Sequence, residues 1–308
     1  MRQCFKADMN KTEKIKGLIG LDLDGTALDT EKHLREPVRQ EIERAMAAGY
    51  LVVPVTGRPV RGIPSDFMTI PGIRYAVTSN GAELYRINDF FSDSWENLFR
   101  VPLSYDQTEQ VLQAIQPYHA LPDCFIDEHG NLAAEHLPLL KLYGLPEGIM
   151  RYILETRIFH DDLPVFLREH SEDIIKVTIH FNMNADGIHE KELAREALSH
   201  IPDILTVSGG RHNLEVTHIS SGKGRGLLRL AELLGVDPSH TMGCGDEEND
   251  LDLIQRSAFG VAMGNALPHV KAKADYVAPS NDEDGVAAAI KEFLSADTDS
   301  DRATVSQD

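Results

Sequence analysis

Short apolar runs alternate with helix-periodic stretches over the first 85 residues of the chain. The runs at 18–21, 51–55 and 75–79 are continuous, and each is followed by small polar residues, as is typical of buried strands that end in turns. Between the first two runs, apolar residues recur at helical spacing until a glycine ends the pattern, namely Val38, Ile42, Ala45 and Met46 before Gly49. Strands that alternate with helices predict a parallel sheet with right-handed crossovers.

The same alternation returns near the C-terminus. We expect strands over 213–216, 241–246, 259–263 and 276–277, and helices over 227–234, 269–274 and 285–294. Residues 1–85 and 210–294 are therefore predicted to form one core. Residues 295–308 are polar and rich in Asp, Ser and Thr, which predicts a disordered tail.

The stretch between the two halves, residues 86–209, has a different pattern. Polar breaks interrupt it and no clear alternation of strand and helix is visible. The expected pieces are helices over 105–118, 147–155 and 189–200, strands over 174–181 and 204–207, and a hairpin over 123–134 that turns at His129-Gly130-Asn131. We therefore predict an inserted domain with an α+β pattern.

Composition narrows the class of protein. A chain of 308 residues has room for about two domains, and no apolar run approaches the roughly 20 residues of a membrane helix. The N-terminal residues 1–16 lack the apolar stretch of a signal peptide and the cysteines number only three, so we expect a cytoplasmic protein. The net charge of −19 opposes binding to nucleic acids and anionic membranes. An anionic ligand would need a local positive charge or a metal ion.

Two acids follow the first predicted strand. Asp22 and Asp24 stand at i and i+2, so strand geometry points both to one side, and Gly25 behind them permits a turn. Two carboxylates this close repel each other unless a cation relieves them, and oxygen ligands select a hard ion such as Mg²⁺. A strand that ends in a solvated Asp-Gly turn would show the same pattern, and these residues alone leave both interpretations open.

Other predicted strand ends and helix starts carry complementary chemistry. If the strands lie side by side, one edge of the sheet gathers Asp22, Asp24, Thr56, Lys223, Asp246 and Asp250. Carboxylates can hold Mg²⁺, an ammonium group can neutralise a phosphoryl group, and the Thr56 hydroxyl and Gly57 N–H can donate hydrogen bonds to it. Taken singly, Lys223 could be a solvated lysine at a helix start. Arg58 could equally be a surface ion-pair residue or face the second domain.

The order of the motifs D-L-D-G-T, T-G-R, G-K-G and G-D-E-E-N-D resembles the haloacid dehalogenase-like superfamily, and within it the Cof-type phosphatases. Supporting matches are the segments 78–82, 214–216 and 260–266. The resemblance implies an α/β fold, with a Rossmann-like doubly wound parallel-sheet core and an inserted α+β cap domain.

The resemblance also implies roles for particular residues. Asp22 would be the nucleophile that forms an aspartyl-phosphate, and Asp24 would act as acid and then base, with a pKa that repulsion between the two acids raises. Mg²⁺ would be bound by Asp22, by Asp24 through its backbone carbonyl, and by Asp246, with Asp250 and Asn249 in support. The catalytic set is completed by Thr56 and Lys223. Gly57, Arg58, Asn80, Gly81 and Asn249 would bind the phosphate or substrate. Glu247 departs from the family pattern, where a small residue is usual.

The sequence therefore predicts a Mg²⁺-dependent phosphatase of small phosphorylated metabolites, with sugar phosphates as the first choice. Alternatives are a phosphatase of nucleotides or of vitamin cofactors such as FMN or pyridoxal phosphate, a phosphomutase, and an inactive binding module on the same fold.

Overall fold

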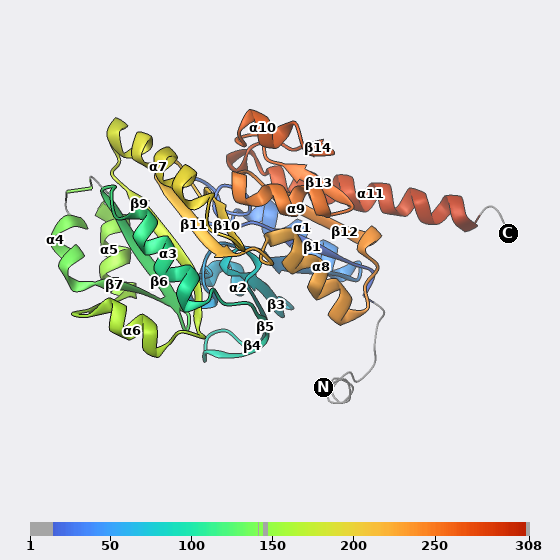
Figure 1. Ribbon diagram of the computed structural model, residues 1–308. Helices are drawn as coiled ribbons and strands as arrows, with labels where there is room; N and C mark the ends of the chain where they lie inside the picture. The colour runs from blue at the N-terminus through green and yellow to red at the C-terminus, as the bar shows by residue number, and fades with distance from the viewer. Residues whose placement is uncertain (1–14, 141, 144–146, 306–308) are drawn as a thin grey trace.

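A central parallel sheet forms the core of the computed structural model, which describes residues 15–140, 142–143 and 147–305 (Figure 1). Its strand order is β14-β13-β12-β1-β2, and every neighbouring pair is parallel. The strands are β1 (Gly17–Leu21), β2 (Tyr50–Pro54), β12 (Thr241–Gly245), β13 (Phe259–Ala262) and β14 (Tyr276–Val277). The N-terminal strand β1 thus lies between β2 and β12, which confirms the predicted parallel sheet built from both halves of the chain.

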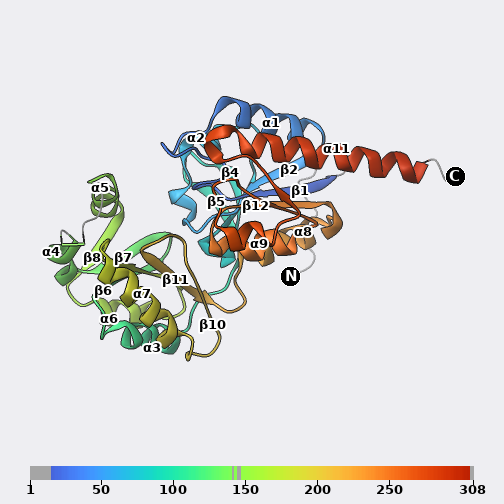
Figure 2. The ribbon, with the colours of Figure 1, turned by 90° about the horizontal axis from the view of Figure 1, so that it is seen from above.

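Helices cover both faces of this sheet (Figure 2). Residue Ile19 of β1 packs in one cluster with α1 (Glu36–Ala47) and α11 (Gly285–Val305). Its neighbour Leu18 packs on the opposite face with α8 (Lys223–Leu234) and α9 (Leu251–Arg256). Successive strand residues point to opposite faces, so a strand buried on both sides reads as a continuous apolar run. The doubly wound α/β architecture is confirmed. Two short helices complete the core, α2 (Ser65–Met68) and α10 (Pro268–Lys271).

A second sheet of six strands lies beside the core, and we call the body that it forms the cap. Its order is β10-β11-β9-β6-β7-β8, with β6 (Ala120–Ile126), β7 (His129–Ala133), β8 (Arg157–His160), β9 (Ile174–Phe181), β10 (Ile204–Val207) and β11 (Asn213–His218). Helices α3 (Tyr105–Ile115), α6 (Leu163–Glu169) and α7 (Ala185–Leu198) pack against its apolar face. The helices α4 (Leu137–Leu140) and α5 (Glu147–Thr156) lie at its outer end (Figure 2). The opposite face packs against α4 and α5 at its outer end and faces the core elsewhere.

Strand pairing supports boundaries for the insertion that differ from the predicted 86–209. Strands β4 (Glu83–Asp89) and β5 (Ser94–Arg100) form an antiparallel sheet with β3 (Tyr75–Thr78), and β3 bridges to the end of β2 through Val55 and Val77. Strand β11, predicted as core, pairs with β9 and β10 instead. The polar breaks after residue 86 are the turns of a hairpin, and pattern alone does not identify the sheet to which a strand belongs. We propose that the insertion begins after Arg100 and ends at His218.

Two local predictions were wrong. The β6–β7 hairpin turns at Asp127 and Glu128, whose φ angles are 46° and 69°, and not at His129-Gly130-Asn131. Acidic side chains occupy these left-handed positions here, although glycine is the usual choice. Helix α11 continues to Val305 through the predicted disordered tail, in a stretch that contains neither glycine nor proline, while residues 306–308 lie outside the described part.

The N-terminal segment on which the cytoplasmic prediction depended falls mostly in residues 1–14, outside the described residues. Among the residues that the structure does describe, no helix combines the length and the apolar character needed to cross a bilayer.

Candidate active site

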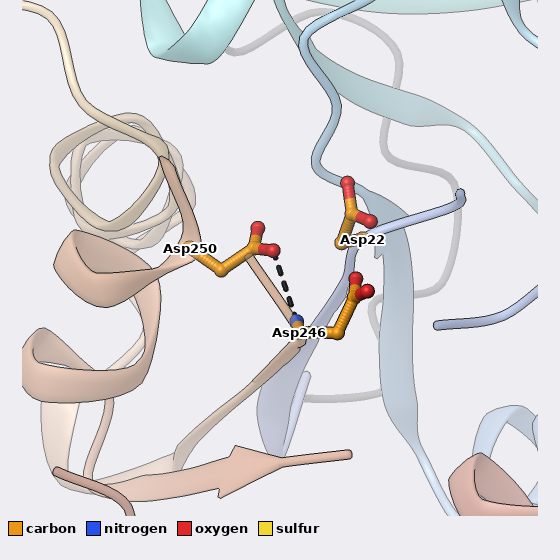
Figure 3. Close-up of side chains that lie close together, drawn as sticks. All are labelled: Asp22, Asp246 and Asp250. Carbon is orange, nitrogen blue, oxygen red and sulfur yellow. Dashed lines mark hydrogen bonds between the residues drawn. The ribbon is translucent and has the colours of Figure 1, made fainter. Parts of the chain in front are cut away.

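Functional side chains meet at the carboxyl ends of three neighbouring parallel strands. Asp22 directly follows β1, Asp246 directly follows β12, and Thr56 follows β2 by two residues. The carboxyl edge of an open parallel sheet is where such folds bind ligands, because the loops there are free to carry polar groups. Figure 3 shows Asp22, at the end of one segment, close to Asp246 and Asp250, which share the loop after β12.

The three aspartates form a compact carboxylate cluster. One oxygen from each lies within 4.8 Å of the others. Asp250 Oδ2 accepts hydrogen bonds from the backbone N–H groups of Asp246 and Glu247, both at 3.0 Å. The Thr26 hydroxyl donates to Asp246 Oδ1 over 3.0 Å. These bonds fix the direction of the carboxylates, so the cluster is held in place by the fold.

Lys223 supplies the only positive charge in direct contact with the described cluster. Its Nζ lies 2.7 Å from Asp22 Oδ1 and 2.6 Å from Asp250 Oδ1, and the side chain is almost fully buried. Burial alone would lower the pKa of this lysine, but the two carboxylates hold it above its usual value. Lys223 is therefore a fixed positive charge at the start of α8.

One ammonium group does not balance three carboxylates. Burial, followed by the charge of Asp250, raises the pKa of Asp22 to about 7 and that of Asp246 to about 8. A divalent cation would relieve this repulsion, and an all-oxygen donor set suits the hard ion Mg²⁺. The donors therefore fit the predicted metal, with Asp22, Asp246 and Asp250 as the side chains that could hold it.

The side chain of Asp24 lies outside this cluster. Arg58 grips its carboxylate with two bonds, from Nε at 2.7 Å and from an η nitrogen at 2.8 Å, and Lys32 Nζ adds a contact at 2.9 Å. Burial would raise the pKa of Asp24, but Arg58 and Lys32 hold it well below its ordinary value. The predicted upward shift from repulsion by Asp22 was therefore wrong, because two neighbouring cations outweigh one neighbouring acid. Arg58 combines the two roles left open for it, since it forms this ion pair and also lines the cavity between core and cap.

The turn after β3 connects the candidate phosphate-binding residues through hydrogen bonds. Asn80 adopts a left-handed φ of 55°, its backbone N–H donates to Thr56 O, and its carbonyl accepts from Gly222 N at 2.8 Å. Its side-chain oxygen accepts from Asn249 Nδ2 at 3.2 Å. Asn80 and Gly81 are buried and do not line the cavity, whereas Thr56, Gly57, Arg58 and Asn249 do. The structure thus places the first two behind the wall that the others form.

Gly81 offers a stability prediction. Its φ is 83°, and a Cβ at this position would lie 2.0 Å from the carbonyl oxygen of Gly222, the residue before Lys223. We expect Gly81→Ala to lower the free energy of unfolding by about 2 kcal/mol or more, from strain and backbone overlap together. Thermal or denaturant unfolding measures this loss. The control is Gly235→Ala, since Gly235 has a φ of 68° but open space around it and should lose only about 1 kcal/mol. Equal losses in the two variants would contradict the proposed overlap.

A cavity of about 240 Å³ opens over the site between core and cap. From the core it is lined by Asp22, Asp24, Lys223 and the residues named above, and from the cap by Phe125, Arg157, Lys176, Thr178, His180 and Glu215. Sequence reasoning assigned no role to these cap residues. A signal for three of them exists, because Lys176, Thr178 and His180 alternate with apolar residues along β9, which is typical of a strand with one polar face.

The fold and the cluster define the class of protein. It is an α/β protein of a core and a cap, with a carboxylate cluster at the carboxyl edge of the core sheet and a lysine paired to that cluster. A sequence model of the haloacid dehalogenase-like hydrolases matches residues 19–290. The chain belongs to this family, which confirms the resemblance read from its motifs.

Comparisons with individual proteins agree. The chain is 28% identical over 294 residues to the 5-amino-6-(5-phospho-D-ribitylamino)uracil phosphatase YwtE of Bacillus subtilis, covering 90% of this chain and 98% of that protein. A solved haloacid dehalogenase-like hydrolase from B. subtilis superposes with a TM-score of 0.73 at 24% identity, over 89% of this chain and 99% of the other. The subclass IIB sugar phosphatase BT4131 gives a TM-score of 0.72 at 24% identity, over 90% and 99%. These two structural likenesses support the fold, including the cap.

Proposed function

We propose that this phosphatase of the haloacid dehalogenase-like family hydrolyses small phosphorylated metabolites with the help of Mg²⁺, through an aspartyl-phosphate on Asp22. The single observation that carries the proposal is the buried cluster in which Asp22 contacts Lys223 and stands next to two further aspartates. With a divalent cation to relieve the repulsion that raises its pKa, the Asp22 carboxylate would be ionised and suited to attack phosphorus, and carboxylates are established covalent nucleophiles for phosphoryl groups.

The residues around Asp22 divide the remaining work. Lys223 would neutralise charge on the phosphoryl group, and Thr56 and Gly57 would donate hydrogen bonds to its equatorial oxygens. When bound, Mg²⁺ would supply further neutralisation of the phosphoryl oxygens. Asp22, Asp246 and Asp250 would hold the ion, and Asp24 stays a proposed ligand through its backbone carbonyl.

Asp24 is proposed as the group that serves the leaving oxygen and then the attacking water. It lines the cavity two residues after Asp22, on the side where Arg58 stands. Arg58 fixes the direction of the Asp24 carboxylate by two parallel bonds and keeps it ionised, so we propose that Asp24 leaves Arg58 and takes up a proton before it serves the leaving oxygen. Arg58 and Asn249 would contact the part of the substrate nearest the phosphoryl group, while Asn80 and Gly81 would support these loops from behind.

Substrate choice is proposed on the size and polarity of the cavity. A space of about 240 Å³ with charged and hydroxyl side chains suits a compact, hydroxyl-rich leaving group, so sugar phosphates are the first candidates. A second candidate is 5-amino-6-(5-phospho-D-ribitylamino)uracil, favoured because three of the similar B. subtilis proteins carry that substrate in their names. A phosphate-release screen over sugar, nucleotide and cofactor phosphates distinguishes these classes. Release of phosphate from none of them in the presence of Mg²⁺ would contradict the proposal.

The metal assignment predicts a specific phenotype for Asp246. Asp246→Asn keeps the shape of the side chain but removes one carboxylate from the cluster, so the Mg²⁺ concentration for half-maximal activity should rise about tenfold or more. Turnover at saturating Mg²⁺ should recover a large part of the wild-type value. A titration of Mg²⁺ against hydrolysis of p-nitrophenyl phosphate measures both quantities. An unchanged Mg²⁺ requirement would remove Asp246 from the metal site.

A further inference from the structure

A buried ion pair in the cap, formed by Lys176 on β9 and Glu215 on β11, stands outside the mechanism above. Lys176 Nζ lies 2.7 Å from Glu215 Oε1, and the exposed fractions of the two residues are only 2% and 7%. Taking two charges out of water is costly, and packed apolar residues are often as stable as a buried pair. Stability alone is therefore a weak explanation for this pair.

Both members of the pair reach across to the core. Lys176 Nζ donates to the carbonyl oxygen of Gly57 at 2.6 Å, within the T-G-R turn that follows β2. Asn80 Nδ2 donates to Glu215 Oε2 at 2.7 Å, so the other carboxylate oxygen holds the turn after β3. One ion pair of the cap is thus hydrogen-bonded to both turns on which the proposed phosphate site depends.

These contacts continue to the catalytic residues. Asn80 accepts a hydrogen bond from Asn249 in the loop that carries Asp246 and Asp250, and its carbonyl binds Gly222 N next to Lys223. The Gly57 peptide lies between Thr56 and Arg58, which both line the cavity. If Lys176 or Glu215 moved, the hydrogen bonds to Gly57 and Asn80 would move these turns, and with them Thr56, Lys223 and Asn249.

The pair also determines the charge beside the phosphoryl group. Glu215 lines the same cavity as Asp22 and Lys223, and a lone carboxylate there would repel a phosphate dianion. Lys176 neutralises it, and the Lys176 ammonium also lies 4.6 Å from the centre of the Phe125 ring, a cation–π contact that helps to hold the ammonium group in place.

We propose that Lys176 and Glu215 are positioning residues for the phosphoryl group, so that the phosphate site of the core is complete only when the cap sheet is docked on it. This inference rests on the proposed function, because it assigns the Gly57 and Asn80 turns to phosphate binding. It differs from a role in choosing the leaving group, since every phosphate ester, and inorganic phosphate itself, would feel the pair.

A second contact between cap and core provides a matched control. Glu128, on the β6–β7 turn of the cap, accepts a hydrogen bond from Trp95 Nε1 at 2.6 Å and pairs with Arg61 Nε at 2.9 Å. Neither Glu128 nor its two partners line the active-site cavity. Glu128→Gln therefore weakens cap docking without touching the phosphate turns.

The test compares Lys176→Met, the double variant Lys176→Met/Glu215→Gln and Glu128→Gln in the full-length protein. The measured quantities are KM and kcat for p-nitrophenyl phosphate and the inhibition constant of inorganic phosphate. Lys176→Met leaves a buried carboxylate without its partner, so KM and the inhibition constant should both rise at least about tenfold. The double variant has no unpaired carboxylate to repel phosphate, but it still lacks the hydrogen bond to Gly57. Its KM and its inhibition constant should therefore lie between those of Lys176→Met and the wild type. Glu128→Gln should stay within about twofold of the wild type.

Each outcome decides the matter. A folded Lys176→Met or double variant with the wild-type inhibition constant for inorganic phosphate would overturn the inference, and so would an equal rise in Glu128→Gln. If Lys176→Met does not fold, the double variant, which buries no unpaired charge, carries the test by the same readout. Wild-type protein without Mg²⁺-dependent hydrolysis of p-nitrophenyl phosphate would overturn the proposed function instead, so the two failures are distinguishable.

Discussion

Asp22→Asn should lower kcat for p-nitrophenyl phosphate by about 10⁴-fold or more, and no phosphoenzyme should form. An amide is not a nucleophile for phosphorus, and the substitution also removes one carboxylate from the proposed metal site. In the wild type the Lys223 ammonium lies 2.7 Å from Asp22 Oδ1, and in the variant it can contact the amide oxygen that replaces this atom. It would also keep Asp250 as a partner, so the loops should stay in place. Steady-state kinetics and mass spectrometry of the acid-quenched enzyme measure the two losses.

The control for Asp22→Asn is Asp29→Asn, in the loop that follows the same strand. Asp29 Oδ1 accepts a local hydrogen bond from His33 N at 2.8 Å, and Asp29 is not among the described residues that line the cavity. This variant should keep turnover close to that of the wild type. Near-normal turnover in purified Asp22→Asn, with the control unchanged, would show that another group forms the covalent bond or that water attacks directly.

Much of the core and of its site could be predicted from the sequence because both depend on local patterns. A continuous apolar run before Asp22 and another before Asp246 are enough to predict two buried parallel strands, and parallel strands bring their carboxyl ends to one edge. The convergence of Asp22 with Asp246 and the adjacent Asp250 follows from that rule, whereas that of Lys223 does not, because the strand before it, β11, belongs to the cap sheet. The distances between these side chains do not follow from the rule either, because they depend on side-chain directions that hydrogen bonds such as Thr26 to Asp246 determine.

The environment of Asp24 shows where local reasoning fails. From the sequence, the nearest charged neighbour is Asp22 at i−2, which predicts a raised pKa. In the folded chain the partners of Asp24 are Arg58, 34 residues away, and Lys32 on the following loop. Long-range cations thus reverse the direction of a shift that the local pattern predicts.

The cap residues were missed for a related reason. Strand β11 alternates apolar and polar residues and stands directly before the core helix α8, so only its pairing with β9 and β10 assigns it to the cap sheet. Glu215 therefore contacts the core from the cap sheet, whereas the sequence pattern placed it in the core. Positions such as Lys176 and Glu215 become interpretable only once the register between strands from different parts of the chain is known.

Loss of Lys223 is expected to have the second-largest effect. Lys223→Met removes the ammonium group that contacts both Asp22 and Asp250, while it keeps a side chain of similar length in a fully buried position. The phosphoryl group would lose its fixed positive partner, and the nucleophile would lose the bond that fixes its direction. Removal of one preorganised donor costs about 10²–10³-fold in turnover, and the loss of positioning should bring kcat at saturating Mg²⁺ down by about 10³-fold or more.

Mg²⁺ should not rescue Lys223→Met, and this separates it from Asp246→Asn. In the proposed roles the ammonium group would act on the phosphoryl oxygens and on Asp22, whereas Asp246 would act on the ion, so excess metal should compensate only for the second loss. The control is Lys291→Met, which removes an ammonium group paired with Glu41 on the surface of the core and should leave kcat unchanged. Measurement of kcat over a wide range of Mg²⁺ concentrations in all three variants distinguishes the roles. Full recovery of Lys223→Met in excess Mg²⁺ would mean that the lysine serves only to balance the charge of the metal site, and its assigned role toward the phosphoryl group would be wrong.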